Sequence, residues 1–90
     1  MELLNTIKGR IERGEINEAI HWLNQVLELF PDKDEAYYLL GNAYRKMSNW
    51  QEALNNYQKA IDLNPDSPAK EAKEMVLDIL GFFNKDMYNH

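Results

Sequence analysis

The sequence repeats itself with a period of 34 residues, and this feature restricts its fold more than any other. Pro31 and Pro65 are separated by that distance, and each is followed by an aspartate. The same shift aligns Glu18-Ala19 with Glu52-Ala53. Self-similarity at a period of this size is typical of stacked structural repeats, in which each unit buries its apolar face against a neighbour.

Each copy divides into two segments whose apolar residues recur at the three- and four-residue spacing of a helix face. This spacing predicts helices at about 2–13, 16–30 and 34–47, a fourth between Asn49 and Asn64, and a fifth from residue 68 to Phe83 or Asn84. No segment alternates with a period of two, so no β-strand is expected. The predicted fold class is all-α.

Polar residues predict where three of these helices begin. Asp32 or Asp34 is available to cap the third helix, because an aspartate side chain accepts hydrogen bonds from the free N–H groups of a first turn. Asn49, with a glutamate three residues later, resembles a capping box at the start of the fourth helix. Ser67 followed by Pro68 has the order of a cap and a first helical residue, and it predicts the start of the fifth.

The second copy resembles the tetratricopeptide repeat, a helix–turn–helix unit with the pattern W-x2-L-G-x2-Y…A-x3-F…P. The matching residues are, in order, Tyr37, Leu40, Gly41, Tyr44, Ala53, Tyr57 and Pro65. The resemblance implies a right-handed superhelix of five antiparallel helices in one domain, residues 1–90. Its parts would be a first repeat at about 1–33, a second at 34–67, a capping helix at about 68–84 and a C-terminal tail at 85–90.

The glycine inside the third predicted helix, Gly41, has a packing explanation. It costs about 1 kcal/mol relative to alanine, but two helices approach closely only where the facing side chains are small. The expected small residues are Gly41, Ala53 and Ala60, and the large residues around them are Tyr37, Tyr44 and Tyr57. Alternating small and large groups interdigitate at the density of a protein interior. We therefore expect Gly41→Leu to destabilise the fold strongly through overpacking.

Both ends of the chain depart from the repeat pattern. The first copy replaces the tyrosines, leucine and glycine of the second with Leu3, Thr6, Ile7 and Arg10, which fits the atypical sequences of terminal repeats. Near the C-terminus, the repeat does not require an apolar cluster formed by Phe82, Phe83, Met87 and Tyr88. We expect this cluster either to fold back over the capping helix or to form an association surface.

Charge and composition argue against several functions. The net charge of −5 and the pI near 4.9 differ from the basic footprint of nucleic-acid-binding proteins. The absence of cysteine excludes disulfides and thiolate metal sites. The N-terminus does not resemble a signal peptide, and no run approaches the ~20 apolar residues of a membrane span. We therefore expect a cytoplasmic protein with neither a nucleic-acid nor a membrane partner.

No residue constellation suggests catalysis, a metal or a cofactor. Residues 32–35 begin like a calcium-binding loop, but Tyr37 stands where that loop requires glycine. The two histidines, His21 and His90, have no cysteine or suitably spaced carboxylates with which to form a zinc site. Paired carboxylates such as Glu15 and Glu18 are usual at a helix start, where the helix dipole favours them. The expectation is a non-enzymatic protein without cofactor or metal.

The resemblance implies a binding surface, because the first helix of each pair lines the inner wall that solenoids use for partners. The family geometry carries over to an inner wall of Leu4, Lys8, Ile11, Tyr38, Asn42, Arg45, Lys46, Ala72, Lys73, Val76 and Ile79. Asn42 stands at a frequent asparagine position, where it can bond the backbone of an extended ligand. The expected ligand is an extended peptide or partner helix with acidic and apolar residues; an ordinary solvated face is the other interpretation.

Two further interpretations concern the partner. Some family members hold the C-terminal carboxylate of a chaperone tail, but Leu4 and Leu39 replace the polar residues of that clamp and only Lys73 remains suitable. Binding of a chaperone tail is therefore not predicted. Two repeats and a cap fall at or below the ~3 repeats that stability usually requires. The alternative function is thus a structural one, with the chain completing its core by pairing as a weak homodimer.

Overall fold

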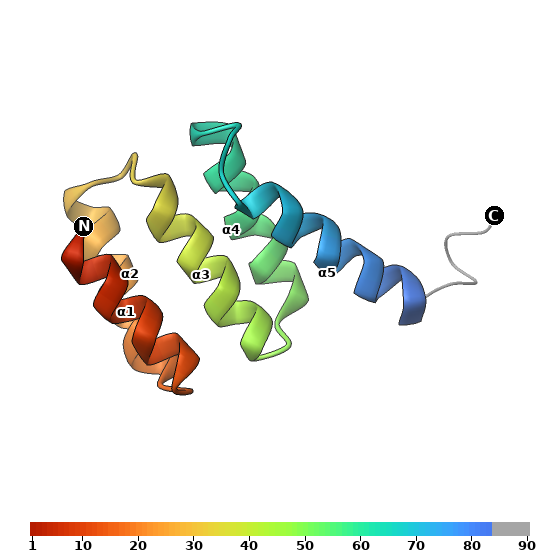
Figure 1. Cartoon of the computed structure of the whole chain (residues 1–90), viewed down its shortest axis with the longest axis horizontal. Helices are drawn as coiled ribbons and strands as arrows, with labels where there is room; N and C mark the ends of the chain where they lie inside the picture. The colour runs from red at the N-terminus through yellow and green to blue at the C-terminus, as the bar shows by residue number, and fades with distance from the viewer. Residues whose placement is uncertain (84–90) are drawn as a thin grey trace.

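The computed structural model describes residues 1–83, with side chains through residue 81. These residues form five helices: α1 (Glu2–Glu12), α2 (Ile16–Leu29), α3 (Asp34–Lys46), α4 (Trp50–Leu63) and α5 (Ala69–Phe83) (Figure 1). The described part contains no β-strand, so the predicted all-α helical-repeat fold is confirmed, with every helix within one residue of its predicted bounds. The predicted apolar cluster of Phe82, Phe83, Met87 and Tyr88 falls on side chains outside those described.

The helices are arranged in two layers. α1 packs against α2, α3 against α4, and α5 against α4. α3 also contacts both α1 and α5, so these three helices form one layer, and α2 and α4 lie behind them in the view of Figure 1. The layer of α1, α3 and α5 corresponds to the inner wall that is predicted from the sequence as the binding surface.

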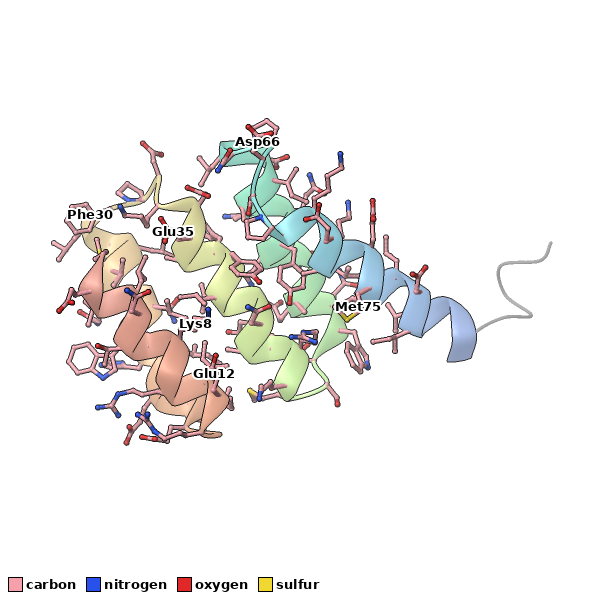
Figure 2. All side chains as sticks on the ribbon, in the orientation of Figure 1. Lys8, Glu12, Phe30, Glu35, Asp66 and Met75 are labelled. Carbon is pink, nitrogen blue, oxygen red and sulfur yellow. The ribbon has the colours of Figure 1, made fainter. Side chains whose placement is uncertain are left out.

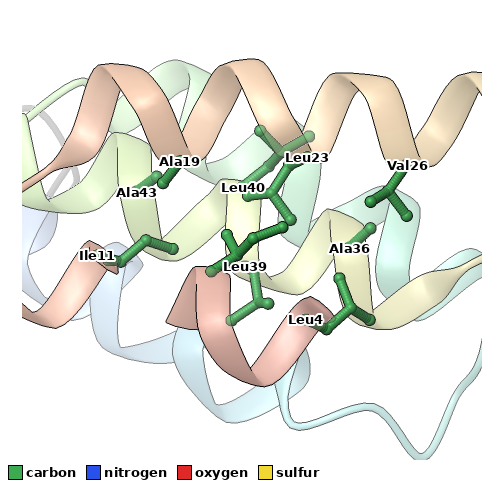
Figure 3. Close-up of a cluster of buried hydrophobic side chains, with 10 residues drawn as sticks. Leu4, Ile11, Ala19, Leu23, Val26, Ala36, Leu39, Leu40 and Ala43 are labelled. Atoms are coloured by element: carbon green, nitrogen blue, oxygen red, sulfur yellow. The ribbon is translucent and has the colours of Figure 1, made fainter. Parts of the chain in front are cut away.

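Two clusters of buried side chains hold the layers together. Figure 3 shows the first, in which apolar side chains of α1, α2 and α3 point toward one another; its members are Leu4, Ile7, Ile11, Ala19, Leu23, Val26, Ala36, Leu39, Leu40 and Ala43. The second joins α4 to α5 and consists of Ala53, Tyr57, Ala60, Ala69, Ala72 and Val76. Tyr37, Tyr38 and Tyr44 of α3 pack against both clusters, so α3 links the two halves of the core.

Gly41 lies directly against the ring of Tyr57. A Cβ atom added at Gly41 would lie 2.4 Å from both Cδ1 and Cε1 of that ring, where carbon atoms in contact are normally about 3.5–4 Å apart. Tyr57 is fully buried. The close approach of α3 and α4 therefore depends on the missing side chain.

The other residues expected at repeat-packing positions differ in burial. Leu40, Ala53 and Ala60 are buried, Tyr37 and Tyr44 are half-buried, and Pro65 is exposed. The exposed position of Pro65 matches its expected part in ending α4, since proline cannot continue a helix. It acts on the backbone rather than through contacts in the core.

Side chains cap α4 and α5 at the predicted residues. Asn49 Oδ1 accepts a hydrogen bond from the backbone N–H of Glu52 at 3.4 Å, and Ser67 Oγ accepts one from the N–H of Ala69 at 3.1 Å. The backbone N–H of Asn49 donates to the carbonyl oxygen of Tyr44 at 2.9 Å. That N–H is therefore already hydrogen-bonded within the turn, and Asn49 caps α4 through its side-chain oxygen alone.

The predicted cap of α3 is wrong. The N-cap residue is Lys33, which makes no side-chain capping bond, and neither Asp32 nor Asp34 takes its place. Backbone groups serve this turn instead, since the Lys33 carbonyl oxygen accepts from the N–H of Ala36 at 3.1 Å. The carboxylate of Asp34 accepts a hydrogen bond from Asn64 Nδ2 at 3.1 Å and so connects the start of α3 to the end of α4.

Candidate functional site

Two adjoining hollows of about 310 and 120 Å³ lie between α1 and α3, and they share Lys8 and Leu39. Their combined lining, called here the α1–α3 groove, consists of Leu4, Asn5, Lys8, Ile11, Glu12, Glu35, Tyr38, Leu39, Asn42, Arg45, Lys46 and Pro68. Figure 2 shows Lys8 and Glu12 on α1 and Glu35 on α3 along this side of the molecule. Seven of the eleven residues predicted for the inner wall line the groove, and the four on α5, Ala72, Lys73, Val76 and Ile79, do not.

The apolar floor of the groove is almost closed to solvent. Leu4 is 2% exposed, Ile11 3% and Leu39 5%, because each packs into the cluster shared by α1, α2 and α3. The prediction that Leu4 and Ile11 offer their side chains to a partner is therefore corrected: they support the groove from below. Polar and charged side chains of α1 and α3, among them Lys8, Asn42 and Arg45, also line the groove.

On α5, the predicted wall also differs from the structure. Val76 is fully buried and Ala72 is 7% exposed, because both pack against α4 in the second cluster. Lys73 is directed toward α4 as well, where its Nζ donates to Gln58 Oε1 at 2.5 Å. Ile79 is half-buried. Ala72, Lys73 and Val76 thus fasten the cap helix, and none of these four α5 positions lines the groove.

A buried tyrosine holds Asn42 at the groove. Tyr57 Oη donates a hydrogen bond to Asn42 Oδ1 across 2.5 Å. Because the amide oxygen accepts this bond, the amide nitrogen retains two N–H donors for another acceptor. Burial raises the pKa of the Tyr57 phenol, while the charge of Arg45 and a hydrogen bond between Arg45 and the phenol act in the opposite direction. The phenol is therefore protonated, and able to donate, at neutral pH.

The groove carries positive charge although the chain as a whole is acidic. Lys8, Arg45 and Lys46 line it together with Glu12 and Glu35. The ion pairs of the described residues lie at the α1–α2 turn: Arg10 with Glu15 and Glu18, and Arg13 with Glu15. None of the three groove cations has a carboxylate partner within that part of the chain. The charge is thus available to an anionic group from outside.

Comparison with known proteins supports the sequence resemblance. A family model described as tetratricopeptide repeat matches residues 34–67, and one described as TPR repeat matches residues 10–48. The solution NMR structure of the Bacteroides fragilis protein BF1650 superposes with a TM-score of 0.90 at 61% sequence identity, over 99% of this chain and 91% of that one. The chain belongs to the tetratricopeptide repeat family. No curated protein matches the sequence.

Tetratricopeptide repeats are generally protein–protein interaction modules and are typically non-enzymatic. Their partners are usually proteins. In the part of this repeat protein that the structure describes, no three His, Cys, Asp or Glu side chains are grouped so that they could hold a metal ion. None of its described helices combines the length and the apolar character needed to cross a bilayer.

Sequence reasoning missed five residues of the groove: Asn5, Glu12, Glu35, Leu39 and Pro68. Helical spacing could have found two of them, since Asn5 and Glu12 lie three and four residues from Lys8 and share its side of α1. Sequence alone does not distinguish Leu39 from its neighbour Leu40, because both are apolar residues of one helix and both are buried. No local pattern indicates Pro68, because its place depends on how the α4–α5 turn returns toward α3.

Proposed function

We propose that the α1–α3 groove binds an extended segment of a partner protein, so that the chain acts as a non-enzymatic interaction module. The observation that carries this proposal is the pair of N–H donors on Asn42, which the hydrogen bond from Tyr57 orients. An extended backbone presents unpaired carbonyl oxygens at regular intervals, and an amide N–H suits such an acceptor. Hollows of about 310 and 120 Å³ suit single side chains of an extended segment better than a helix of ~10 Å diameter.

Charge supports the same proposal and indicates the composition of the segment. Lys8, Arg45 and Lys46 have no carboxylate partner among the described residues. Complementary charge at an interface steers association and fixes register. A segment with acidic residues next to apolar ones would complement both the cations and the small apolar area of the floor.

The test uses a peptide selected on the full-length protein from a random peptide library and measures its affinity by fluorescence anisotropy. The double variant Asn42→Ala/Arg45→Ala is expected to lose binding and to remain folded, as its helical circular dichroism spectrum would show, with a lower unfolding midpoint because the buried Tyr57 hydroxyl loses its acceptor. The matched control is Asn55→Ala/Lys59→Ala, which deletes the same kinds of groups from exposed positions of α4 outside the groove. Unchanged affinity in the groove variant would contradict the proposal.

Self-association is a second candidate, and a specific observation favours it. Large apolar side chains are exposed where α2 and α4 end: Leu29 is 77% exposed, Phe30 50% and Leu63 42%. Exposed apolar groups that gather at one end of a domain are typical of association surfaces. Sedimentation equilibrium over a hundredfold range of concentration tests this function. A tight dimer that Phe30→Ser converts to monomer would support it, and a monomer throughout would exclude it.

A further inference from the structure

A second surface of the molecule surrounds the turn between α2 and α3. Two hollows of about 400 and 220 Å³ lie there, and Pro31 lines both of them. Their combined lining, called here the turn surface, consists of residues 29–35 together with Tyr37, Lys59, Asp62 and Leu63. Figure 2 labels Phe30 and Glu35 near this turn. Glu35 also lines the α1–α3 groove, so the two surfaces adjoin.

Exposed apolar side chains lie on the turn surface where α2 and α4 end. Leu29, Phe30 and Leu63 are all exposed, and Leu29 keeps 77% of its surface accessible. Removal of apolar surface from water is favourable. A partner that covers these three side chains therefore gains a hydrophobic contribution, and the surrounding charges decide which partner fits.

Carboxylates outnumber cations on the turn surface. The lining holds four of the former and two of the latter: Asp32, Asp34, Glu35 and Asp62, with Lys33 and Lys59. Neither lysine has an ion pair within the described residues, and each instead lies over an aromatic ring. The distance from Nζ to the ring centroid is 5.9 Å for Lys33 over Phe30 and 5.4 Å for Lys59 over Tyr37. The surface is thus left with a net negative charge.

The helix ends at this surface add to its attraction for cations. The C-terminus of a helix carries partial negative charge, and a cation near it is stabilising. α2 and α4 end here at Leu29 and Leu63, and neither has a basic residue in its last turn. α4 instead places Asp62 there, hydrogen-bonded at 2.8 Å to the uncharged amide of Gln58. The N-terminus of α3 lies at the same surface, but two acidic residues of its first turn already balance it, so an external cation gains from the ends of α2 and α4.

We propose that the turn surface binds a cationic segment of a partner protein, in which lysine or arginine residues flank apolar ones. The apolar side chains of the segment would cover Phe30 and Leu63, and its cations would lie near Asp32, Asp62 and the C-termini of α2 and α4. Complementary charge of this kind steers association and fixes the register of the two chains. The segment proposed for the α1–α3 groove has the opposite charge, so this inference does not depend on the groove. A chain that uses both surfaces holds two different partners and acts as an adaptor.

Charge argues against the other occupants of this surface. Two copies in a symmetric dimer present the same patch to each other, so Asp32 and Asp62 of one copy would approach the carboxylates of the other. Nucleic acids and anionic membranes carry negative charge as well and are repelled. A metal ion does not fit, since the described residues contain no group of three His, Cys, Asp or Glu side chains that could hold one.

NMR of the ¹⁵N-labelled full chain tests the inference. The probes are the heptapeptide Gly-Lys-Leu-Arg-Leu-Lys-Gly blocked at both ends, the same peptide with Gln in place of its three cations, and the same peptide with Ser in place of both leucines. We expect the first peptide to shift backbone amides of the turn surface. Each altered peptide should bind roughly tenfold more weakly or worse, since it loses either three exposed charge pairs or two apolar contacts.

The outcomes separate this inference from the function proposed for the groove, which is tested with its own selected peptide. The absence of shifts with the first peptide, or shifts confined to the α1–α3 groove, would overturn the inference. A Gln peptide that binds as tightly as the cationic one would overturn it too. Sedimentation equilibrium decides on a second copy: a dimer that Phe30→Ser dissociates would assign the turn surface to self-association and so exclude the proposed partner.

Variants provide a second readout, the dissociation constant for the cationic peptide. Asp32→Asn/Asp62→Asn is expected to weaken binding about fivefold, as the loss of two exposed charge pairs implies. Glu71→Gln/Asp78→Asn removes the same charge from exposed positions of α5 and is the matched control. Asp62→Lys should also weaken binding but raise the thermal unfolding midpoint, because it places a cation at the C-terminus of α4. Equal affinities of the turn-surface and control variants would contradict the inferred contact.

Discussion

The contact between Gly41 and Tyr57 makes a quantitative prediction about stability. In Gly41→Ala, the added methyl group would lie 2.4 Å from two ring carbons of Tyr57. Relief to an ordinary contact requires movement of about 1 Å. The ring cannot turn aside easily, because Tyr57 is fully buried, its hydroxyl bonds Asn42 and its ring packs near that of Tyr38 at a centroid distance of 6.1 Å. Movement of α3 away from α4 is the remaining route, and it loosens the core.

The magnitude follows from two opposing effects. Overpacking of this kind costs about 1–3 kcal/mol, and replacing a helical glycine by alanine returns up to about 1 kcal/mol. Because the added methyl group meets two ring carbons at once, the cost falls in the upper part of that range, about 2–3 kcal/mol. We therefore expect Gly41→Ala to lower the free energy of unfolding by about 1–2 kcal/mol, and Gly41→Leu to lower it further. For a domain of this size, that loss corresponds to a fall in Tm of about 5–15 °C.

Urea unfolding followed by circular dichroism measures this change, and another glycine of the same chain is its control. A Cβ atom at Gly9, in α1, would meet only Arg13 Nη1 at 3.5 Å, an ordinary contact. Gly9→Ala should therefore raise the free energy of unfolding by up to about 1 kcal/mol. A Gly41→Ala midpoint equal to or above that of the wild type, with Gly9→Ala stabilised, would refute the packing argument.

Three further predictions concern local structure. Gly14 has a φ of 86°, so Gly14→Ala should cost about 1–2 kcal/mol through the left-handed backbone, as urea unfolding would register. Ser67→Ala should cost about 1 kcal/mol and speed amide exchange in the first turn of α5, because Ala69 loses its capping partner; equal exchange in both proteins would contradict this. Burial raises the pKa of Tyr57, so folding favours the protonated phenol. The stability that this preference contributes is present below the unfolded tyrosine pKa of about 10. It is lost as the pH rises through the higher pKa of the folded state. Thermal melts from pH 8 to 11 should show this loss in the wild type and less of it in Tyr57→Phe.

The helices and their packing could be predicted because their causes are local. The spacing of apolar residues and the caps at Asn49 and Ser67 lie within a few positions of the boundaries that they set. The cap of α3 was mistaken for a reason that the sequence does not display. The carboxylate of Asp34 bonds Asn64, 30 residues away, and is not a cap of its own helix.

The lining of the groove could be predicted only in part. The prediction applied the same inner-wall positions of the repeat to α1, α3 and α5. The transfer assumes that α1, α3 and α5 are rotated equally about their axes. Instead, the apolar stripes of α1 and α5 determine those rotations, and they turn Leu4, Ile11 and Val76 into the core. The contact of Arg45 with Met75 depends on where α5 docks, which no pattern within α3 specifies.

Tyr57 connects the packing of the repeat to the chemistry of the groove. Its ring fills the space that Gly41 leaves open, and its hydroxyl fixes the amide of Asn42. A phenylalanine at this position would preserve the first contact and remove the second. Side chains that a core already holds rigid lose little conformational entropy when a partner binds. The orientation of the Asn42 amide is therefore a consequence of the same close helix approach that Gly41 permits, and the recognition surface inherits its rigidity from the core.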